Sequence, residues 1–510
     1  MLASIPSATV LGVRGSPVTV EVFVGDGLPG YHMVGMPDTA CRESRDRVRA
    51  AISSAGFGWP NRCITVNLAP TTQRKTGAGL DVAIAIGVLV ASEQLSGDLV
   101  HRHAFIGELG LDGTIRRVPG VAPMVDALDD GSVVVPPGNV VEAQIAARGP
   151  VLAAPDLTTA VACLSGTQTW DPLDPVDSAG EPPPLPDLSD VRGQPVARRA
   201  LEIAAAGGHH LLLVGSPGSG KTMLAQRLAG LLPPLDRDQA LETTMVHSAA
   251  GLRMPPGGLV RQPPFRAPHH TTSVIGLVGG GSHQLRPGEV SLANNGVLFM
   301  DELGEFGRAA LDGLREPLEE GVIRVARAAI RVTMPARFLL VAATNPCPCG
   351  GGPPGACECD DGARLRYLRR LSGPITDRFD LRVVVHRPAV DELLGSDASE
   401  SSTDVRQRVV AARAVAKSRA GKLNAALAPD ELDTLAPLSE PARALLREEV
   451  ETDRLTGRGY HRVRRVARTI ADLDGAHDEP ISIADVELAL QMRAPLRQRS
   501  VGPMADRWIA

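Results

Sequence analysis

The stretch GSPGSGKT, Gly215–Thr222, decides the fold because it matches the pattern G-x-x-x-x-G-K-T. It lies between the apolar runs HLLLVG and TMLAQRLAGLL, which are typical of a buried strand and a helix, and the pattern requires this context. Glycines let backbone N–H groups close around phosphate oxygens, and the helix start adds its positive dipole end. We therefore expect a nucleotide phosphate site made by the whole loop: Gly215, Ser216, Pro217, Gly218, Ser219, Gly220, Lys221 and Thr222.

Two side chains of this loop have specific expected roles. Lys221 should reach the β- and γ-phosphates, and the Thr222 hydroxyl should bind Mg²⁺. A Gly-rich turn can match the pattern by chance. The chain has only four lysines, and from its composition a chance match is about one in a hundred or less.

Two further apolar runs end in polar residues that suit the same site. GVLFMDEL presents Asp301 and Glu302 at the end of a predicted buried strand, the place where ligands bind in a parallel sheet. We expect Asp301 to hold Mg²⁺, partly through water, and Glu302 to polarise the attacking water. FLLVAATN ends on Asn345, which suits orienting that water. The alternative for Asn345 is a turn residue before Pro346.

Arg378 precedes another apolar strand, in SGPITDRFDL. An arginine supplied by a neighbouring subunit can stabilise transition-state charge, worth about 10³–10⁵ in rate. The alternative is a surface salt bridge with Asp377 or Asp380, and the spacing leaves both interpretations open.

The chain divides into segments of different composition. Short apolar runs split by Gly and Pro, such as VTVEVFV, CITVNLAP and the hairpin-like FIGELGLDGTIRRV, indicate a mixed α+β domain at the N-terminus. Strands that alternate with helices indicate a parallel α/β sheet in the middle. We expect an α+β domain over 1–166, a Pro-rich acidic linker over 167–190, an α/β motor over 191–389, a helical lid over 390–495 and a tail over 496–510.

Composition bounds the class of protein. The chain of 510 residues is 43% hydrophobic and 22% charged, which is ordinary for a globular protein. A net charge of -5 shows no global sign of nucleic-acid binding, so such a site must be a local basic patch. The N-terminus lacks a signal-peptide pattern, and the apolar run near Val82–Ala91 is too short to span a bilayer. We expect a cytoplasmic protein without membrane contact.

Four of the seven cysteines crowd into the pattern C-x-C-x₇-C-x-C: Cys347, Cys349, Cys357 and Cys359. Four thiolates could hold a tetrahedral structural Zn²⁺, although C-x-C is tighter than the usual spacing. Free thiols in a reducing cytoplasm are an equal alternative.

Long stretches of the chain together resemble the ComM/YifB family of magnesium-chelatase-like AAA+ ATPases. The resemblance rests on NLAPTTQRKTGAGLDVAIAIG near the N-terminus, on GQPVARRALEIAAAGGHHLLLVGSPGSGKTMLA, FRAPHHTTS, RPGEVSLANNGVLFMDEL, NPCPCG and LSGPITDRFDL in the motor, and on GRGYHRVRRVARTIADL in the lid. It covers almost the whole chain. It implies an ATP-driven hexameric ring that acts as a DNA helicase and promotes branch migration of incoming single strands.

The resemblance also implies a role for each candidate residue: Walker A for Lys221 and Thr222, Walker B for Asp301 and Glu302, sensor 1 for Asn345, the arginine finger for Arg378 and sensor 2 of the lid for Arg465. Arg462 and Arg464 are close enough in sequence to compete with Arg465.

The N-terminal part resembles the S5-like fold of the Lon protease catalytic domain. Lon-type proteolysis needs a Ser nucleophile and a Lys base about forty residues further on. KTGAGLDVA has no Ser at the matching place, and no lysine occurs between Lys75 and Lys221. We therefore expect a binding or assembly module.

A basic hairpin is expected between the acidic pair and Asn345. GVIRVARAAIRVTMPARF carries four arginines: Arg324, Arg327, Arg331 and Arg337. In related helicases a hairpin at this place points into the central pore, where arginines would bind DNA phosphates without reading sequence. A solvated hairpin face is the alternative. FRAPHHTTS is a second pore candidate, with His269 and His270 expected to form loop hydrogen bonds.

Two other functions stay open. One is a magnesium-chelatase motor subunit that helps insert Mg²⁺ into a porphyrin, although the resemblance implies that such subunits lack the N-terminal domain. The other is a nucleotide-gated scaffold whose N-terminal domain recruits a protein.

Overall fold

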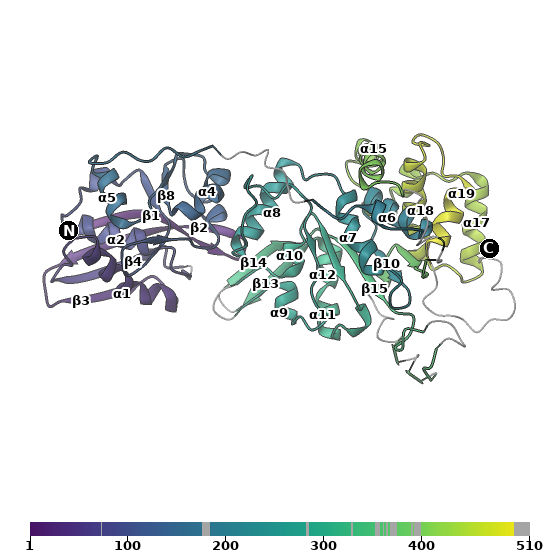
Figure 1. Cartoon of the computed structure of the whole chain (residues 1–510), viewed down its shortest axis with the longest axis horizontal. Helices are drawn as coiled ribbons and strands as arrows, with labels where there is room; N and C mark the ends of the chain where they lie inside the picture. The colour runs from purple at the N-terminus through teal and green to yellow at the C-terminus, as the bar shows by residue number, and fades with distance from the viewer. Residues whose placement is uncertain are drawn as a thin grey trace.

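The computed structural model shows three parts that follow one another along the longest axis of the molecule (Figure 1). They are an N-terminal domain with a mixed sheet, a central parallel α/β domain and a C-terminal helical domain, which confirms the expected fold class. The predicted boundary at 389–390 and the predicted tail at 496–510 lie outside the described residues. The structure describes residues 1–72, 74–175, 184–281, 285–327, 330–351, 357–360, 362–363, 366–367, 375–388, 391 and 399–493.

The N-terminal domain is built on a four-stranded sheet of order β1-β2-β4-β3, antiparallel except for the β3–β4 pair. A second, parallel sheet has the order β5-β8-β9, and β6 and β7 form the predicted hairpin. The elements are β1 (Leu2–Leu11), β2 (Arg14–Gly25), β3 (Gly30–Val34), α1 (Thr39–Ser54), β4 (Cys63–Ala69), α2 (Asp81–Ala91), β5 (His103–Phe105), β6 (Glu108–Leu109), β7 (Ile115–Arg116), α3 (Val121–Asp126), β8 (Ser132–Val135), α4 (Val140–Ala146), β9 (Val151–Ala153) and α5 (Leu157–Leu164).

Helix α2 forms the centre of this domain. All eleven of its residues are buried because it packs against β1, β2 and α1, which explains why every residue after Asp81 is apolar or glycine. Gly87 lets the helix approach the sheet, since a Cβ atom there would lie 2.6 Å from Val22 Cγ2. At the helix start the buried Asp81 accepts a hydrogen bond of 2.7 Å from Arg47 Nε.

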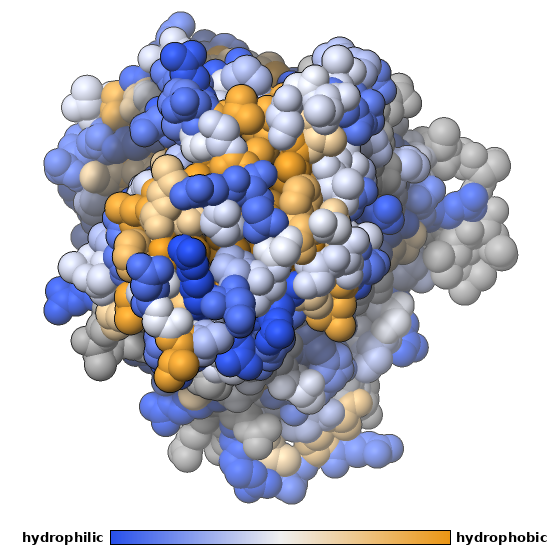
Figure 2. Space-filling model, turned by 90° about the vertical axis from the view of Figure 1, so that its left-hand side faces the viewer, coloured by the Kyte–Doolittle hydropathy of each residue, from blue (hydrophilic) through white to orange (hydrophobic). Residues whose placement is uncertain are grey.

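The outer end of the N-terminal domain carries apolar side chains at its surface, which gather on the face seen in Figure 2. Leu2 of β1 and Phe23 of β2 face each other across the strand pair and are 64% and 50% exposed. The other exposed large apolar residues near them in sequence are Met1, Leu28, Val34 and Met36.

The central domain holds a five-stranded sheet of order β11-β12-β15-β10-β16, in which every neighbouring pair is parallel. Its elements are α6 (Pro195–Gly207), β10 (Leu211–Val214), α7 (Lys221–Leu231), α8 (Arg237–Ala249), β11 (Phe265–Arg266), α9 (Val274–Val278), α10 (Glu289–Leu292), β12 (Val297–Met300), α11 (Arg308–Gly313), α12 (Arg315–Glu320), β13 (Val322–Arg327), β14 (Ile330–Pro335), β15 (Leu339–Thr344) and β16 (Leu381–Val384).

Both faces of this sheet are buried, so its strands are continuous apolar runs. Leu211 and Leu213 of β10 join a core formed with α6, α7 and the C-terminal helices, whereas Leu212 joins a core with residues of α8 to α12. Phe299 and Met300 of β12 divide between the same two cores. This alternation places helices on both sides of the sheet.

The C-terminal domain is helical, with α18 packed against α19, α6 and α15. Its elements are α15 (Ser402–Ala420), α16 (Leu432–Leu435), α17 (Glu440–Glu451), α18 (Gly457–Leu473) and α19 (Ile483–Gln491). None of the helices within the described ranges combines the length and apolar character needed to cross a membrane.

The N-terminal domain packs directly on the central domain. Val13, in the turn between β1 and β2, is buried in the same core as Val332 and Met334 of β14. A Cβ atom at Gly12 would lie 2.3 Å from Val332 Cγ1. A second contact is polar, since the buried Glu142 accepts a 3.1 Å hydrogen bond from Ser248 Oγ of α8.

Candidate nucleotide-hydrolysis site

The phosphate loop lies at the carboxyl edge of the parallel sheet, between β10 and α7. Gly218 and Gly220 have φ angles of 77° and 91°, in the left-handed region that glycine adopts at little cost. Cβ atoms built at these two positions would meet no atom within 4 Å, so the space beside both glycines is open. The buried Ser219 Oγ has no hydrogen-bond partner among the described residues. Backbone N–H groups of such a loop, at the start of a helix, fit phosphate oxygens.

Lys221 is 9% exposed and folds back over the loop. Its Nζ donates to the carbonyl oxygens of Gly215 and Ser216 at 2.8 and 2.9 Å, and to Asn345 Oδ1 at 3.2 Å. Burial lowers the pKa of Lys221, and the charges of Asp301 and Glu302 oppose this shift. The structure therefore brings Asn345 to the loop, where its amide can take part in the chemistry. The turn interpretation of Asn345 does not account for this contact.

Asp301 and Thr222 meet directly, because β12 and β10 end at the same edge of the sheet. Thr222 Oγ1 donates to Asp301 Oδ2 at 2.7 Å. Mg²⁺ prefers oxygen ligands, usually one or two carboxylates together with phosphate oxygens and water. A hydroxyl and a carboxylate that converge beside a phosphate loop fit that ion.

Glu302 has an unusual backbone conformation, with φ 51° and ψ 49°. Such left-handed angles cost a non-glycine residue about 1–2 kcal/mol and occur often at functional sites. Its backbone N–H donates to Asp301 Oδ1 at 2.9 Å, and its half-exposed carboxylate lies 3.1 Å from His270 Nδ1. Sequence patterns indicate only a loop role for His270, whereas the structure places its ring against the candidate general base. His270 reaches this position because FRAPHHTTS begins with Phe265–Arg266, the strand β11, which pairs with β12.

A cavity of about 220 Å³ lies beside the phosphate loop. Apolar side chains of Val191, Met223, Leu224 and Pro388 form part of its wall, and Gly218–Gly220 form another part. Asp190, Arg192 and Gln194 form the polar rest of the wall, and the position of the cavity beside the loop suits the part of a nucleotide that lies beyond the phosphates. Sequence patterns do not predict this cavity, because its wall combines the start of the α/β domain with the segment after β16.

Arg378 lies at the opposite edge of the sheet. It precedes β16, and the next residues pair with His210 at the start of β10, so the strands separate it from the phosphate loop. A strand of four residues, such as β10, is about 13 Å long. Arg378 forms an ion pair with Glu319, and not with Asp377 or Asp380 as the salt-bridge alternative expected. Arg378 therefore does not reach the phosphate loop of its own chain.

The three candidate lid arginines on α18 have different surroundings. Arg464 is buried and donates to Asp433 and to the carbonyl oxygens of Leu432 and Ala436. This network occupies the guanidinium of Arg464 with contacts inside the C-terminal domain.

Arg462 and Arg465 lie near the same sheet edge as Arg378. Arg462 pairs with Asp380 at 3.0 Å. Burial lowers the pKa of Arg465, against the charge of Asp380. Burial and the charges of Arg462, Arg458 and Arg315 lower the pKa of Arg378. Neither Arg378 nor Arg465 is brought to Lys221, and both belong to a basic cluster on the far edge.

The predicted basic hairpin is confirmed as the antiparallel pair β13–β14. Ile323, Val332 and Met334 are buried on one face, and Arg324 and Arg331 are exposed on the other. Arg324 pairs with Glu316 and Glu320 of α12. Within the described part of the chain Arg331 forms no ion pair. The side chain of Arg327 lies outside the described part, and Arg337, after β14, is exposed.

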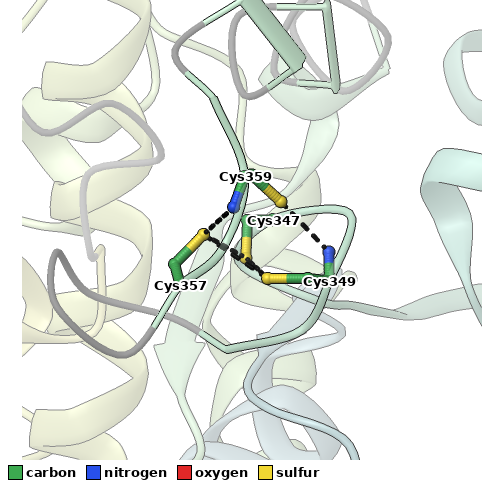
Figure 3. A group of neighbouring side chains, drawn as sticks. All are labelled: Cys347, Cys349, Cys357 and Cys359. Carbon is green, nitrogen blue, oxygen red and sulfur yellow. Dashed lines mark hydrogen bonds between the residues drawn. The ribbon is translucent and has the colours of Figure 1, made fainter.

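The four clustered cysteines bring their sulfur atoms together, as Figure 3 shows. All four Sγ atoms lie within 4.8 Å of one another, and the sulfurs of Cys347, Cys349 and Cys357 are 3.4 Å apart. Tetrahedral Zn²⁺ with Zn–S bonds near 2.3 Å separates its sulfurs by about 3.8 Å. The geometry is compatible with a zinc site.

Comparison with known proteins gives matches along the whole chain. Models described as "Subunit ChlI of Mg-chelatase", "Magnesium chelatase, subunit ChlI" and "Magnesium chelatase, subunit ChlI C-terminal" match residues 20–139, 187–393 and 399–493. YifB of Escherichia coli is 43% identical over 476 residues, which cover 93% of this chain and 94% of YifB.

Two other relatives match over similar lengths. Competence protein ComM of Haemophilus influenzae is 41% identical over 506 residues, 97% of this chain and 98% of ComM. A Mycobacterium tuberculosis protein, Rv2897c, is 44% identical over 495 residues, 96% of this chain and 97% of its own. The similarity therefore runs through all three parts of the fold.

The roles of Glu302 and Lys221 can be separated by substitution. Glu302→Gln removes the charge that would polarise water, so ATP turnover should fall by about 10²–10⁴-fold while ATP still binds. Lys221→Ala should lose ATP binding itself. Phosphate release and binding of a fluorescent nucleotide measure the two effects. Glu440→Gln, on the exposed surface of α17, is the matched control. Unchanged turnover in Glu302→Gln would contradict the assignment.

The neighbours Arg464 and Arg465 should respond differently to truncation. Arg464→Ala takes a hydrogen bond from the carbonyl oxygen of Ala436 at a cost of about 1–3 kcal/mol, while that of Leu432 keeps its bond from the Ala436 N–H, so the melting temperature should fall. Arg465→Ala removes no side-chain hydrogen bond within the described residues, and it should lower ATP turnover with little change in melting temperature. Equal loss of stability in both variants would show that Arg465 is structural too.

Proposed function

The chain belongs to the magnesium-chelatase ChlI-like family of AAA+ ATPases, which includes YifB and ComM, and we propose that it is a ring-forming motor that moves on DNA and remodels recombination intermediates. The observation that carries the proposal is the convergence of Lys221, Thr222, Asp301, Glu302 and Asn345 at one edge of the parallel sheet. These groups supply what hydrolysis of a nucleoside triphosphate needs from one chain.

Each residue has a role that follows from its position. Lys221 and the loop N–H groups bind the β- and γ-phosphates, and Asn345, beside Lys221, orients the attacking water. Glu302 accepts the proton of that water as general base. Thr222 and Asp301 are the oxygen donors that would hold Mg²⁺, whose charge offsets that of the phosphates.

Ring formation is supported by the separation of the two sheet edges. In one chain Arg378, Arg462 and Arg465 cluster at the far edge, away from Lys221. A neighbouring copy that packs this edge against the phosphate site would supply the missing positive charge in the transition state. Each hydrolysis site would then be complete only between two subunits. In a closed ring, such as a hexamer, every site has a neighbour that completes it.

The DNA role is supported by the hairpin β13–β14 and by a relative. Arg331 is exposed on the hairpin and can contact phosphates without reading the bases, whereas Arg324 on the same face is paired with Glu316 and Glu320. The H. influenzae relative is named a competence protein. Strand exchange of incoming single-stranded DNA is an activity that would account both for the hairpin arginines and for a role in competence.

Two other functions remain as candidates to be tested. The model described as a magnesium-chelatase subunit also matches residues 20–139, so the N-terminal domain does not by itself exclude a chelatase motor. A nucleotide-gated scaffold is favoured by the apolar surface seen in Figure 2 and by the exposed apolar side chains of the N-terminal domain, which include Leu2, Phe23 and Leu28. ATP-dependent partner capture without strand movement would favour the scaffold.

Mixing two inactive variants tests the ring. Lys221→Ala and Arg378→Ala should each lose ATP turnover alone. If Arg378 acts on the neighbouring subunit, random mixed rings contain intact interfaces, and about a quarter of wild-type turnover should return. Phosphate release from equimolar mixtures measures this, and each variant mixed with wild type is the control. If ATP turnover does not return in the mixtures, Arg378 does not act in the active site of a neighbouring subunit.

Single-stranded and branched DNA should stimulate ATP turnover at low salt, and a three-strand assay should show branch migration. Arg331→Ala should weaken single-strand binding and lower its salt dependence, by about 0.7 in the log–log slope for each phosphate that is no longer neutralised. Arg443→Ala, on exposed α17, is the charge-matched control. If DNA neither binds nor stimulates turnover at low salt, the DNA role is wrong, and a porphyrin metallation assay with partner subunits then tests the chelatase candidate.

A further inference from the structure

The cysteine cluster lies on the segment that directly follows Asn345, at the carboxyl end of β15. Cys347, two residues after Asn345, is 2% exposed, and its carbonyl oxygen accepts a 3.0 Å hydrogen bond from the N–H of Gly350. This bond closes a tight turn that Gly350 completes with a φ of 75°. The turn therefore ties the first two cysteines of the cluster to the residue beside Lys221.

The same turn contacts the phosphate loop, with Gly350 packed against Pro217. A Cβ atom at Gly350 would lie 2.5 Å from Cδ and 2.7 Å from Cγ of Pro217, so only glycine fits at this contact. The carbonyl oxygen of Pro217 accepts a 3.1 Å hydrogen bond from Arg387 Nη2. Pro217 is thus held by the cysteine turn and by the segment after β16.

The sulfur atoms of the cluster contact one another and also accept backbone N–H groups of the same loop. Each of these bonds is weak, because sulfur is a weak donor and a weak acceptor. Metal binding by four thiolates stabilises a small loop strongly, because the site forms only in the folded chain. Soft sulfur ligands in a tetrahedral set favour Zn²⁺ over hard cations such as Mg²⁺.

We propose that one structural Zn²⁺ ion is bound by Cys347, Cys349, Cys357 and Cys359. The bound ion fixes the conformation of the phosphate loop in two ways: Gly350 contacts Pro217 of the loop, and the turn holds the adjacent Asn345. Metal loading then controls nucleotide affinity from outside the nucleotide site. The coupling rests on the proposed ATPase function, whereas the metal site itself does not.

Metal content tests the site independently of activity. Protein purified without added zinc should contain about one zinc per chain. Cys357→Ser should lose this zinc, and Cys63→Ser, a partly buried cysteine of the N-terminal sheet, should keep it. Wild-type protein without metal would overturn the site, and iron with a visible absorption band would overturn its assignment to zinc.

Nucleotide affinity tests the coupling. Gly350→Ala leaves all four cysteines in place but drives a Cβ atom into Pro217, so zinc should stay at the wild-type level while affinity for a fluorescent ATP analogue falls about 5-fold or more. Gly421→Ala is the matched control, because Gly421 also has a positive φ, 67°, but a Cβ atom there meets nothing within 4 Å. Unchanged affinity in zinc-loaded Gly350→Ala would overturn the coupling.

The outcomes separate this inference from the proposed function. Cys357→Ser should also bind the nucleotide analogue more weakly, with circular dichroism confirming that it is folded. If folded, zinc-free Cys357→Ser bound nucleotide as tightly as wild type, the coupling would be wrong. If wild-type protein held zinc but bound no nucleotide, the ATPase assignment would fail and the metal site would stand.

Discussion

The register of the parallel strands is the constraint on which the rest of the structure depends. Val214 of β10 pairs with Thr344 of β15, and Met300 of β12 pairs with Ala342, so the three strands end almost level. Both faces of these strands are apolar, and hydrophobic pattern alone therefore fixes their register weakly. Polar contacts at the carboxyl edge of the sheet specify the register further. The bond from Lys221 to Asn345 forms only when the strands end together, so the site and the sheet stabilise each other.

How much the sequence could predict depends on whether a feature is local. The phosphate loop, the acidic pair after β12 and the hairpin β13–β14 are each encoded within a short stretch, and their patterns carry the periods of strand and helix. Arg464 and Arg465 are adjacent on α18, yet one is buried in a carbonyl network and the other is not. Their difference depends on which face of the helix meets α16, and this contact is set by the tertiary packing. The left-handed backbone of Glu302 has no sequence signature either.

The charges of the central domain are divided between two edges of one sheet. The carboxyl edge offers Lys221 and backbone N–H groups to an anion. The amino edge holds Arg462 and Arg465 near Asp380, and Arg378 beside Arg462. Burial alone would raise the pKa of Asp380, but His209 and Arg462 more than offset this effect and lower it to about 2. The carboxylate therefore stays ionised and holds Arg462 in place. The two edges of the sheet therefore differ in chemistry: the carboxyl edge binds anions, and the amino edge carries arginines.

The packing of the β1–β2 turn against β14 has a consequence for how the chain is made. Gly12 and Val13 are synthesised first, but Val332, which covers Gly12, is added roughly three hundred residues later. The first domain to leave the ribosome thus completes its surface only after the hairpin of the motor has formed. Contacts of such long sequence separation form slowly. Until then the apolar side of the β1–β2 turn is exposed to solvent. Nascent chains can associate with one another through this surface for as long as translation of the central domain takes.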